Sequence, residues 1–474
     1  MKKLLSPFCL VLFVQVFFVY TITAQNKVTL TNHDVSGSNV YDNTATIQDK
    51  VTPALALQHY IHTPDPAYQW EIKDSFEIHG VKGYDLLLTS QKWRQYTWRH
   101  QLTILSPKEN NYDGALLFIT GGSDKNEQPN WKKPNDDLAK MFVSLAEKNK
   151  AIIAIIRQVP NQPLYDSLTE DALISYTLHQ FNADNDYTWP LLFPMVKSAV
   201  KAMDAVQEFS NKNLQHPVNR FVISGASKRG WTTWLTGASD PRVQAIGPMV
   251  IDILNMPVNL NHQLQAYGEY SVQIEDYVKL GIVQGMGTES GNSLVSMIDP
   301  YSYRQKLTMP KMLFMGTNDE YWVIDNVKNY LKDIPGYNMI HYVPNAGHNL
   351  GDGKSAFAAL SAFFGISMKH GAYPACKWKT STTKKGVKLT VNASKDVLLG
   401  ATLWYADSDD KDFRNEQWKS KDLQTEHKAK IKTTELFPAK GYRAFYIDLT
   451  YQDPNGGEYT VSTRAFVVDG NKIL

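Results

Sequence analysis

Residues 221–230, Phe-Val-Ile-Ser-Gly-Ala-Ser-Lys-Arg-Gly, decide the fold predicted for this chain. β-favouring and small residues lead into Ser227, and a helix-like segment follows it. The pattern predicts a strand, a sharp turn that carries the serine, and a helix. Such a turn strains the serine backbone and holds its hydroxyl above the sheet as a nucleophile. The match to G-x-S-x-G is partial, because Arg229 stands where the last glycine is usual and Gly230 follows it.

Two later stretches place an acid and a histidine after the serine. Residues 312–319 are an apolar strand that ends in a G-x-x-D turn at Asp319, and residues 339–348 are a strand that ends in a loop with His348. The order serine, acid, histidine is that of α/β-hydrolases. Each of the three lies just past the carboxyl end of a predicted strand, the edge of an open α/β sheet where sites gather.

These residue types suit acyl transfer to a serine. A serine hydroxyl is a weak nucleophile at neutral pH, so we expect His348 to take the proton of Ser227 as attack occurs. Asp319 would fix the tautomer of the imidazole and stabilise the imidazolium.

The oxyanion that forms during attack needs donors placed in advance. We expect the backbone N–H of Lys228, the residue after the nucleophile, to be one donor. The apolar strand 115–120 opens onto Gly121-Gly122, so the N–H of Gly122 is the expected second donor, with Ser123 as the other choice.

Each assignment has a structural alternative. Ser227 could cap the following helix, a role that serine often fills. Asp319 could also be a helix cap, and Asp325 is a rival acid. His348 could be a loop histidine without a task, and Gly122 could belong to a plain turn. Chain order, spacing and strand ends together favour the triad.

Several motifs extend beyond these residues: Gly-Ala-Ser-Lys-Arg-Gly-Trp at 225–231, Met-Ile-Asp-Pro-Tyr-Ser-Tyr at 297–303, Gly-Thr-Asn-Asp-Glu-Tyr-Trp at 316–322, Asn-Ala-Gly-His-Asn at 345–349 and Leu-Thr-Ser-Gln-Lys-Trp at 88–93. Together they resemble the PhoPQ-activated pathogenicity-related family, from roughly residue 45 to the C-terminus. The resemblance implies an α/β-hydrolase related in its catalytic domain to prolyl-oligopeptidase-like serine hydrolases, with Ser227, Asp319 and His348 as the triad. A dipeptidyl-peptidase-like activity is associated with a eukaryotic relative, and the family's natural substrates are poorly defined.

The N-terminus has the pattern of a secretory signal peptide. Lys2 and Lys3 are followed by an apolar run over residues 10–20 and by Ala24, a small residue at the expected cleavage point. The run is too short for a membrane span. We therefore predict removal of residues 1–24, a periplasmic or extracellular location and no membrane contact after cleavage. A retained N-terminal anchor is the alternative.

Composition restricts the partners. The chain has 49 Lys and Arg against 47 Asp and Glu, and loss of Lys2 and Lys3 leaves the two signs equal, so no nucleic-acid partner is expected. Cleavage would leave Cys376 as the one cysteine, which excludes an intramolecular disulfide. No metal or cofactor motif is present, and His59 and His62 are interpreted as surface or packing residues. The expected partner is a small-molecule or peptide substrate; the oligomeric state is left open.

The pattern of strands and helices predicts three regions after the signal peptide. Residues 25–44 form a polar lead-in, residues 45–372 an α/β-hydrolase catalytic domain, and residues 373–474 an immunoglobulin-like β-sandwich. Antiparallel strands before residue 110 precede buried parallel strands at 115–120, 151–156, 221–225, 245–251, 311–316 and 339–344. Helices are expected at 194–209 and 354–364.

Two segments, 164–191 and 255–299, do not fit the minimal sheet and are rich in acids and aromatics. We predict that they form a cap over the site; plain structural insertions are the alternative. Glu275-Asp276 could hold a substrate amine, although a helix surface explains them better. Three tryptophans are interpreted as packing residues rather than a carbohydrate platform: Trp378, Trp404 and Trp418.

The sequence therefore predicts a secreted serine hydrolase that uses no cofactor and cleaves an ester or amide through an acyl-enzyme. The alternative is a catalytically inactive, secreted binding or signalling protein on a hydrolase fold, since a fold does not imply an activity.

Overall fold

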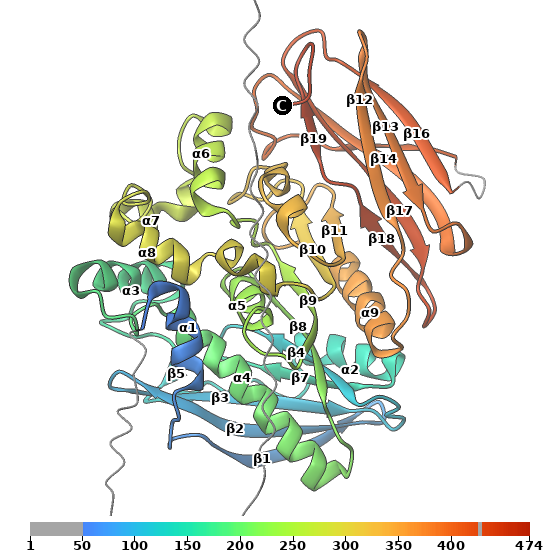
Figure 1. Cartoon of the computed structure of the whole chain (residues 1–474). Coiled ribbons are helices and arrows are strands. Elements are labelled where there is room, and N and C mark those ends of the chain that lie inside the picture. The colour runs from blue at the N-terminus through green and yellow to red at the C-terminus, as the bar shows by residue number, and fades with distance from the viewer. Residues whose placement is uncertain (1–50, 425–428) are drawn as a thin grey trace, which may run out of the picture. The chain divides into compact units, whose positions relative to one another are not determined.

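One large mixed sheet runs through the computed structural model, which describes residues 51–424 and 429–474 (Figure 1). Across the sheet the strands lie in the order β1 (Gln69–Ile78), β2 (Val81–Trp93), β3 (Tyr96–Ser106), β7 (Ile152–Ile156), β4 (Gly114–Ile119), β8 (Arg220–Ala226), β9 (Val243–Met249), β10 (Lys311–Gly316), β11 (Asn338–Val343), β18 (Glu458–Ser462), β17 (Tyr442–Gln452), β14 (Leu398–Ser408) and β15 (Lys419–Asp422). Strand β19 (Phe466–Val468) also pairs with β17.

The centre of the sheet is parallel, as predicted from its continuous apolar runs. Strands β7, β4, β8, β9, β10 and β11 pair in parallel, and β3 joins β7 in antiparallel fashion. Every residue of β4, β7 and β10 is buried. The sheet is therefore covered on both faces in the region where the predicted strands end in Ser227, Asp319 and His348.

Alternate residues of the central strands face opposite layers of helices. Ala115, Leu117 and Ile119 of β4 belong to one apolar core with α4 (Leu192–Phe209) and α5 (Lys228–Gly237). Leu116 and Phe118 belong to a second core with α2 (Asp137–Asn149) and α9 (Lys354–Met368). The flanking helices expected at 194–209 and 354–364 lie in these two layers.

Helix α2 begins where the sequence supplies a cap. Asp136 precedes α2, and its carboxylate accepts a hydrogen bond of 3.0 Å from the N–H of Ala139, which is a typical N-cap. The apolar side chains of α2 then recur at helical spacing, and they are buried: Ala139, Phe142, Val143 and Ala146.

The N-terminal part differs from the expectation of strands alone, because α1 (Pro53–His62) precedes β1. A proline in the first turn favours this helix. His62 Nδ1 lies 2.8 Å from the carbonyl oxygen of Gln58, on the exposed surface. In the described part of the chain there is no group of three or more His, Cys, Asp and Glu that could hold a metal.

The segments expected to form a cap contain four helices, α3 (Glu170–Asp184), α6 (Met256–Tyr267), α7 (Glu275–Lys279) and α8 (Glu289–Ile298). Helix α3 contacts α7 and α8, and the four lie at the green and yellow side of Figure 1. A two-stranded ribbon, β5 (Asp124–Lys125) and β6 (Gln128–Pro129), follows β4. Among the described residues, none of the helices has the length and apolar character needed for a membrane crossing.

The C-terminal strands form two antiparallel sheets. Strands β12 (Cys376–Thr382), β13 (Gly386–Ala393) and β16 (Lys430–Leu436) form one. The other contains β14, β15, β17, β18 and β19, and its apolar residues share a core with β13. This second sheet is continuous with the central sheet, because β18 pairs with β11 at Ser462 and Ile340. The pairing covers a strand edge that would otherwise expose unpaired backbone groups.

Candidate active site

Ser227 stands between β8 and α5 in a strained conformation, with φ 59° and ψ −124°. Residues other than glycine rarely adopt positive φ, and such strain concentrates at functional sites. The Ser227 side chain makes no capping hydrogen bond with α5, so the helix-cap alternative is wrong.

Glycines on both sides make the turn possible. A Cβ atom on Gly225 would lie 2.8 Å from the carbonyl oxygen of Ile119, and one on Gly230 would lie 2.7 Å from that of Met249. Gly230 therefore allows the close helix–strand approach for which the G-x-S-x-G motif uses its last glycine.

Arg229, the departure from the motif, connects the turn to the cap. Its Nε donates to the carbonyl oxygen of Val159 at 2.5 Å, and its two terminal nitrogens donate to the Glu170 carboxylate at 2.7 and 2.6 Å. Burial raises the pKa of Glu170, but the bond from Arg229 outweighs it and holds the pKa at about 2. The nucleophile turn is thus tied to the first residue of α3.

The structure brings the three predicted triad residues together. His348 Nε2 lies 3.0 Å from Ser227 Oγ, and His348 Nδ1 lies 3.1 and 3.0 Å from the carboxylate oxygens of Asp319. With Nδ1–H donating to Asp319, Nε2 can accept the serine proton. Asp319 is 4% exposed; burial raises its pKa, and the hydrogen bond from His348 opposes that rise.

Asp325, the rival acid, lies elsewhere. Its carboxylate pairs with Lys328 at 2.8 Å and lies 3.4 Å from His262 Nε2. Because its two partners are away from His348, the structure contradicts Asp325 as the triad acid.

Neighbours of Asp319 hold His348 in place, and sequence reasoning assigned them no role. The Tyr321 ring lies over the imidazole with centroids 4.1 Å apart and planes at 31°. Its N–H donates to Asp319 at 2.9 Å, and the N–H of His348 donates to Glu320 at 2.8 Å. The signal was present in the run Asp-Glu-Tyr-Trp at 319–322.

The expected oxyanion donors lie at the ends of β4 and β8. Lys228 is the first residue of α5, where N–H groups have no intrahelical partner. Gly122 follows β4 with φ 151°, and its carbonyl oxygen accepts a hydrogen bond from Gln162. Within residues 51–424 and 429–474, the N–H groups of Lys228 and Gly122 have no hydrogen-bond partner. Their assignment as oxyanion donors stays a prediction.

A cavity opens beside Ser227 under the cap helices. It contains about 580 Å³ of empty space, its open mouth included. Leu178 of α3 and Leu260 of α6 line it together with Ser227, so both segments expected to form a cap reach the site. Glu275 is exposed and pairs with Lys279 at 2.6 Å, which supports the helix-surface interpretation.

The carboxylate of Asp171, in the cavity wall, has three polar partners. Lys228 Nζ lies 2.6 Å from its carboxylate. The Tyr277 hydroxyl donates to it at 2.9 Å and the Tyr321 hydroxyl at 3.4 Å. Asp171 thereby connects α3, α5, α7 and the loop that carries Asp319.

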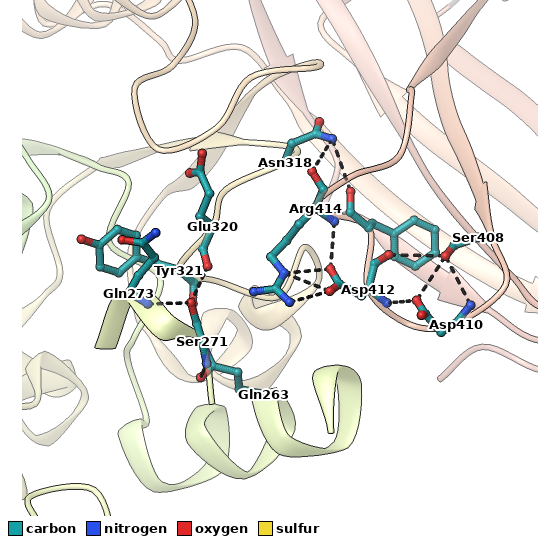
Figure 2. Close-up of polar contacts among 11 residues, drawn as sticks. Gln263, Ser271, Gln273, Asn318, Glu320, Tyr321, Ser408, Asp410, Asp412 and Arg414 are labelled. Carbon is teal, nitrogen blue, oxygen red and sulfur yellow. Dashed lines mark hydrogen bonds and ion pairs between the residues drawn. The ribbon is translucent and has the colours of Figure 1, made fainter. Parts of the chain in front are cut away.

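Figure 2 shows how the cap holds that loop, which we call the acid loop (residues 317–322). Gln263 Nε2 of α6 donates to the carbonyl oxygen of Tyr321 at 2.7 Å, and the Ser271 hydroxyl donates to that of Glu320 at 2.7 Å. The backbone on both sides of Tyr321 is therefore fixed by cap side chains.

On the other side of the acid loop, Asn318 binds the C-terminal region. Its side-chain amide donates to the carbonyl oxygens of Phe413, Arg414 and Glu416 at 3.3, 3.1 and 2.8 Å. Figure 2 shows Asn318 beside the segment from Ser408 to Arg414. The Arg414 guanidinium lies 3.8 Å from the centre of the Tyr267 ring, which adds a cation–π contact to the cap.

The loop that carries His348, here called the histidine loop (residues 344–350), is bound to the C-terminal region through Asn345. Its Nδ2 donates to the carbonyl oxygen of Trp418 at 3.0 Å, and its Oδ1 accepts from the N–H of Trp418 at 2.7 Å. Trp418 is 2% exposed and packs on Tyr446 at 5.4 Å, in agreement with the packing interpretation. The loops of Asp319 and His348 are thus both held by the segment 413–418.

Comparisons with known proteins agree with the predicted family. The model of the PhoPQ-activated pathogenicity-related protein family matches residues 57–414. The chain is 31% identical over 429 residues to autocrine proliferation repressor protein A of Dictyostelium discoideum, covering 83% of this chain and 85% of that protein. Among solved structures, acetyl xylan esterase 1 from Thermoanaerobacterium sp. JW/SL YS485 is 16% identical, with a TM-score of 0.46 and coverage of 67% of this chain and 92% of that one. An S-formylglutathione hydrolase from Agrobacterium tumefaciens is 10% identical, with a TM-score of 0.41 and coverage of 63% and 98%.

Proposed function

The chain belongs to the PhoPQ-activated pathogenicity-related protein family, and from this premise we propose that it is a serine hydrolase that cleaves an ester or amide bond. The observation that supports the proposal most directly is the 3.0 Å contact between Ser227 Oγ and His348 Nε2 on a strained strand–helix turn. A nucleophile, a base within hydrogen-bond reach and a group that orients the base are the parts that covalent catalysis requires.

In the proposed reaction, Ser227 Oγ attacks the carbonyl carbon of the substrate and His348 Nε2 takes its proton. Asp319 stabilises the imidazolium, and the N–H groups of Lys228 and Gly122 hold the oxyanion. Collapse of the tetrahedral intermediate breaks the bond to the leaving group, which receives the proton from His348. Water, activated by the same imidazole, then releases the acid from the acyl-serine.

Labelling with a fluorophosphonate probe tests this proposal. The wild-type protein should be labelled, and Ser227→Ala should lose both labelling and turnover while it keeps its thermal stability. Ser293→Ala on α8, where the exposed hydroxyl donates to the carbonyl oxygen of Glu289, is the matched control and should label normally. A wild-type protein that is not labelled, or a labelled Ser227→Ala protein, would refute the proposal.

The second candidate is a binding or signalling protein that uses the fold without catalysis. It is motivated by the relative from Dictyostelium discoideum, which is named as a repressor of proliferation. The same labelling experiment separates the two candidates, because a non-catalytic protein has no need of an activated serine.

We further propose export of the protein and removal of residues 1–24, which lie outside the described residues. The basic start and short apolar run support a signal peptide. Expression with export machinery should yield a mature chain that begins at Gln25, measurable by intact mass. A secreted chain that retains residues 1–24 would contradict the proposal.

For the C-terminal region we propose an immunoglobulin-like sandwich over residues 373–474. Two antiparallel sheets that share one apolar core support it, since face-to-face packing of such sheets defines a sandwich.

A further inference from the structure

The cavity beside Ser227 is almost entirely hydrocarbon. Helix α5 contributes Trp231, one turn beyond Ser227; the segment after β9 contributes Ile251 and Ile253; and α6 contributes Leu260. Met286, between α7 and α8, belongs to the same wall. A wall of this kind favours an apolar ligand group over water.

The few polar groups in the wall are occupied by one another. Asp171 is paired with Lys228 and accepts from Tyr277 and Tyr321. Glu170, next to it in the chain, is held by Arg229. Among the described residues of this wall, a substrate ammonium would therefore meet no unpaired carboxylate, and burying such a charge without a partner is costly.

The cavity is also larger than a water site. Its empty space is about 580 Å³, the open mouth included, which far exceeds what one water-sized group needs.

We propose that the cavity binds the acyl chain of the substrate, so that the enzyme prefers esters of aliphatic acids longer than acetate. This inference rests on the proposed function of Ser227. In the first half-reaction the ester C–O bond breaks, a bond forms between Ser227 Oγ and the acyl carbon, and the alcohol leaves with the proton from His348. Water then breaks the acyl–serine bond and releases the carboxylic acid.

A series of p-nitrophenyl esters tests the preference. From acetate through butyrate and hexanoate, kcat/KM should rise about fourfold for each added methylene, the factor expected when one methylene is buried. It should then level off or fall once the cavity is full. Equal or higher kcat/KM for acetate would overturn the proposal, and so would faster cleavage of dipeptide anilides with a free amino terminus.

Substitutions in the cavity wall test whether this cavity causes the chain-length preference. Leu260 is 5% exposed and lines the cavity, whereas Val258 on the same helix is 45% exposed and does not. Leu260→Trp should lower the ratio of kcat/KM for hexanoate to that for acetate at least tenfold, and Val258→Trp should leave the ratio unchanged. Because added volume in a packed site can disturb folding, Met286→Ala provides a second arm and should move the optimum to longer chains. An unchanged profile in a folded Leu260→Trp protein and in Met286→Ala would overturn the proposal.

Fluorophosphonate labelling of the same preparations distinguishes failure of the acyl-cavity proposal from failure of the serine-hydrolase proposal. A protein that labels at Ser227 but shows no dependence on chain length refutes the acyl cavity and leaves the serine hydrolase standing. A protein that neither labels nor hydrolyses any ester refutes both.

Discussion

Asp319 and Asp325 are both buried carboxylates near the end of β10, but they touch different groups. Asp319 lies against His348, whereas Asp325 lies against Lys328 and His262. The sequence favoured Asp319 as the triad acid and kept Asp325 as a rival, because a carboxylate at either position follows the same strand. Only the contacts at the residue scale separate them.

Asp319→Asn should therefore lower kcat by about 10⁴, because the amide stabilises the wrong tautomer of His348. Steady-state hydrolysis of an activated ester measures the loss. Asp325→Asn is the comparison and should keep kcat within a few fold of wild type. Equal losses in the two variants would count against the assignment of the acid.

Asp252 gives a prediction about pH. The residue is 2% exposed and follows β9. Its pKa is raised to about 8, chiefly by burial; the Tyr330 hydroxyl lowers the pKa, and the neighbouring Asp319 and Asp325 carboxylates add to the rise. The folded protein thus keeps a proton that the unfolded chain, with an ordinary aspartate, gives up near pH 4. Between these two pKa values the folded state binds more protons, so the free energy of unfolding falls as pH rises.

Asp252→Asn should flatten this dependence. Melting temperatures measured between about pH 5 and about pH 8 should fall less in the variant than in wild type. Asp299 and Asp448 contribute slopes of the same sign, since burial raises the pKa of each to about 7. His100 and His341 contribute the opposite sign below about pH 6.5, since burial lowers the pKa of each to about 4. The exposed Asp396→Asn serves as control and should keep the full wild-type slope; an Asp252→Asn protein with that same slope would exclude the explanation.

At the scale of elements, an ion pair joins the turn that carries Ser227 to the cap helix α3. Arg229 spans the two through Glu170. The sequence showed that the position departs from the usual glycine, but a partner so distant in the chain left no local signal.

Arg229→Gln should lower the free energy of unfolding by about 1 kcal/mol, a modest loss because Glu170 is 38% exposed and solvent screens the charge left behind. The depressed pKa of Glu170 contributes stability that is present above its unfolded value and lost as pH falls toward about 2. The variant should therefore lose less stability on acidification than wild type, as urea titrations at several pH values would show. Arg99→Gln, which breaks an ion pair with Glu127 away from the turn, is the control. Parallel pH curves for Arg229→Gln and wild type would contradict the role of this pair.

Much of the fold and the site was predictable from local patterns. The apolar runs predicted the parallel strands. The positions of Ser227, Asp319 and His348 at the strand ends predicted that they lie together, because the carboxyl ends of parallel strands meet at one edge of the sheet. Helix α1 was missed, since a short segment with few buried side chains has little periodic signal. The support of His348 by Tyr321 was missed as well, because stacking depends on side-chain direction rather than on spacing.

At the scale of the whole described molecule, the C-terminal region contributes to the site. Asn318 and Asn345 bind the segment 413–418 next to the acid and the histidine. The sequence predicted separate β strands there but could not reveal these contacts, nor the pairing of β18 with β11, because both join segments distant in the chain.

Asn345→Ala should reduce kcat at least tenfold with little change in KM, because small displacements of a catalytic group are costly. The free energy of unfolding should fall by about 1–3 kcal/mol, since the backbone groups of Trp418 lose their partners. Asn392→Ala on the exposed side of β13 is the matched control for stability and rate. A destabilised Asn345→Ala protein with unchanged kcat would show that the contact only supports folding.

The pairing of β18 with β11 also bears on what a shortened chain would do. A fragment that stops before Glu458 would leave β11 with bare N–H and C=O groups along one side, next to apolar strands. Such an open border invites a strand from another copy. The last stretch of this chain therefore covers an edge of β11 that would otherwise be open to pairing with another copy.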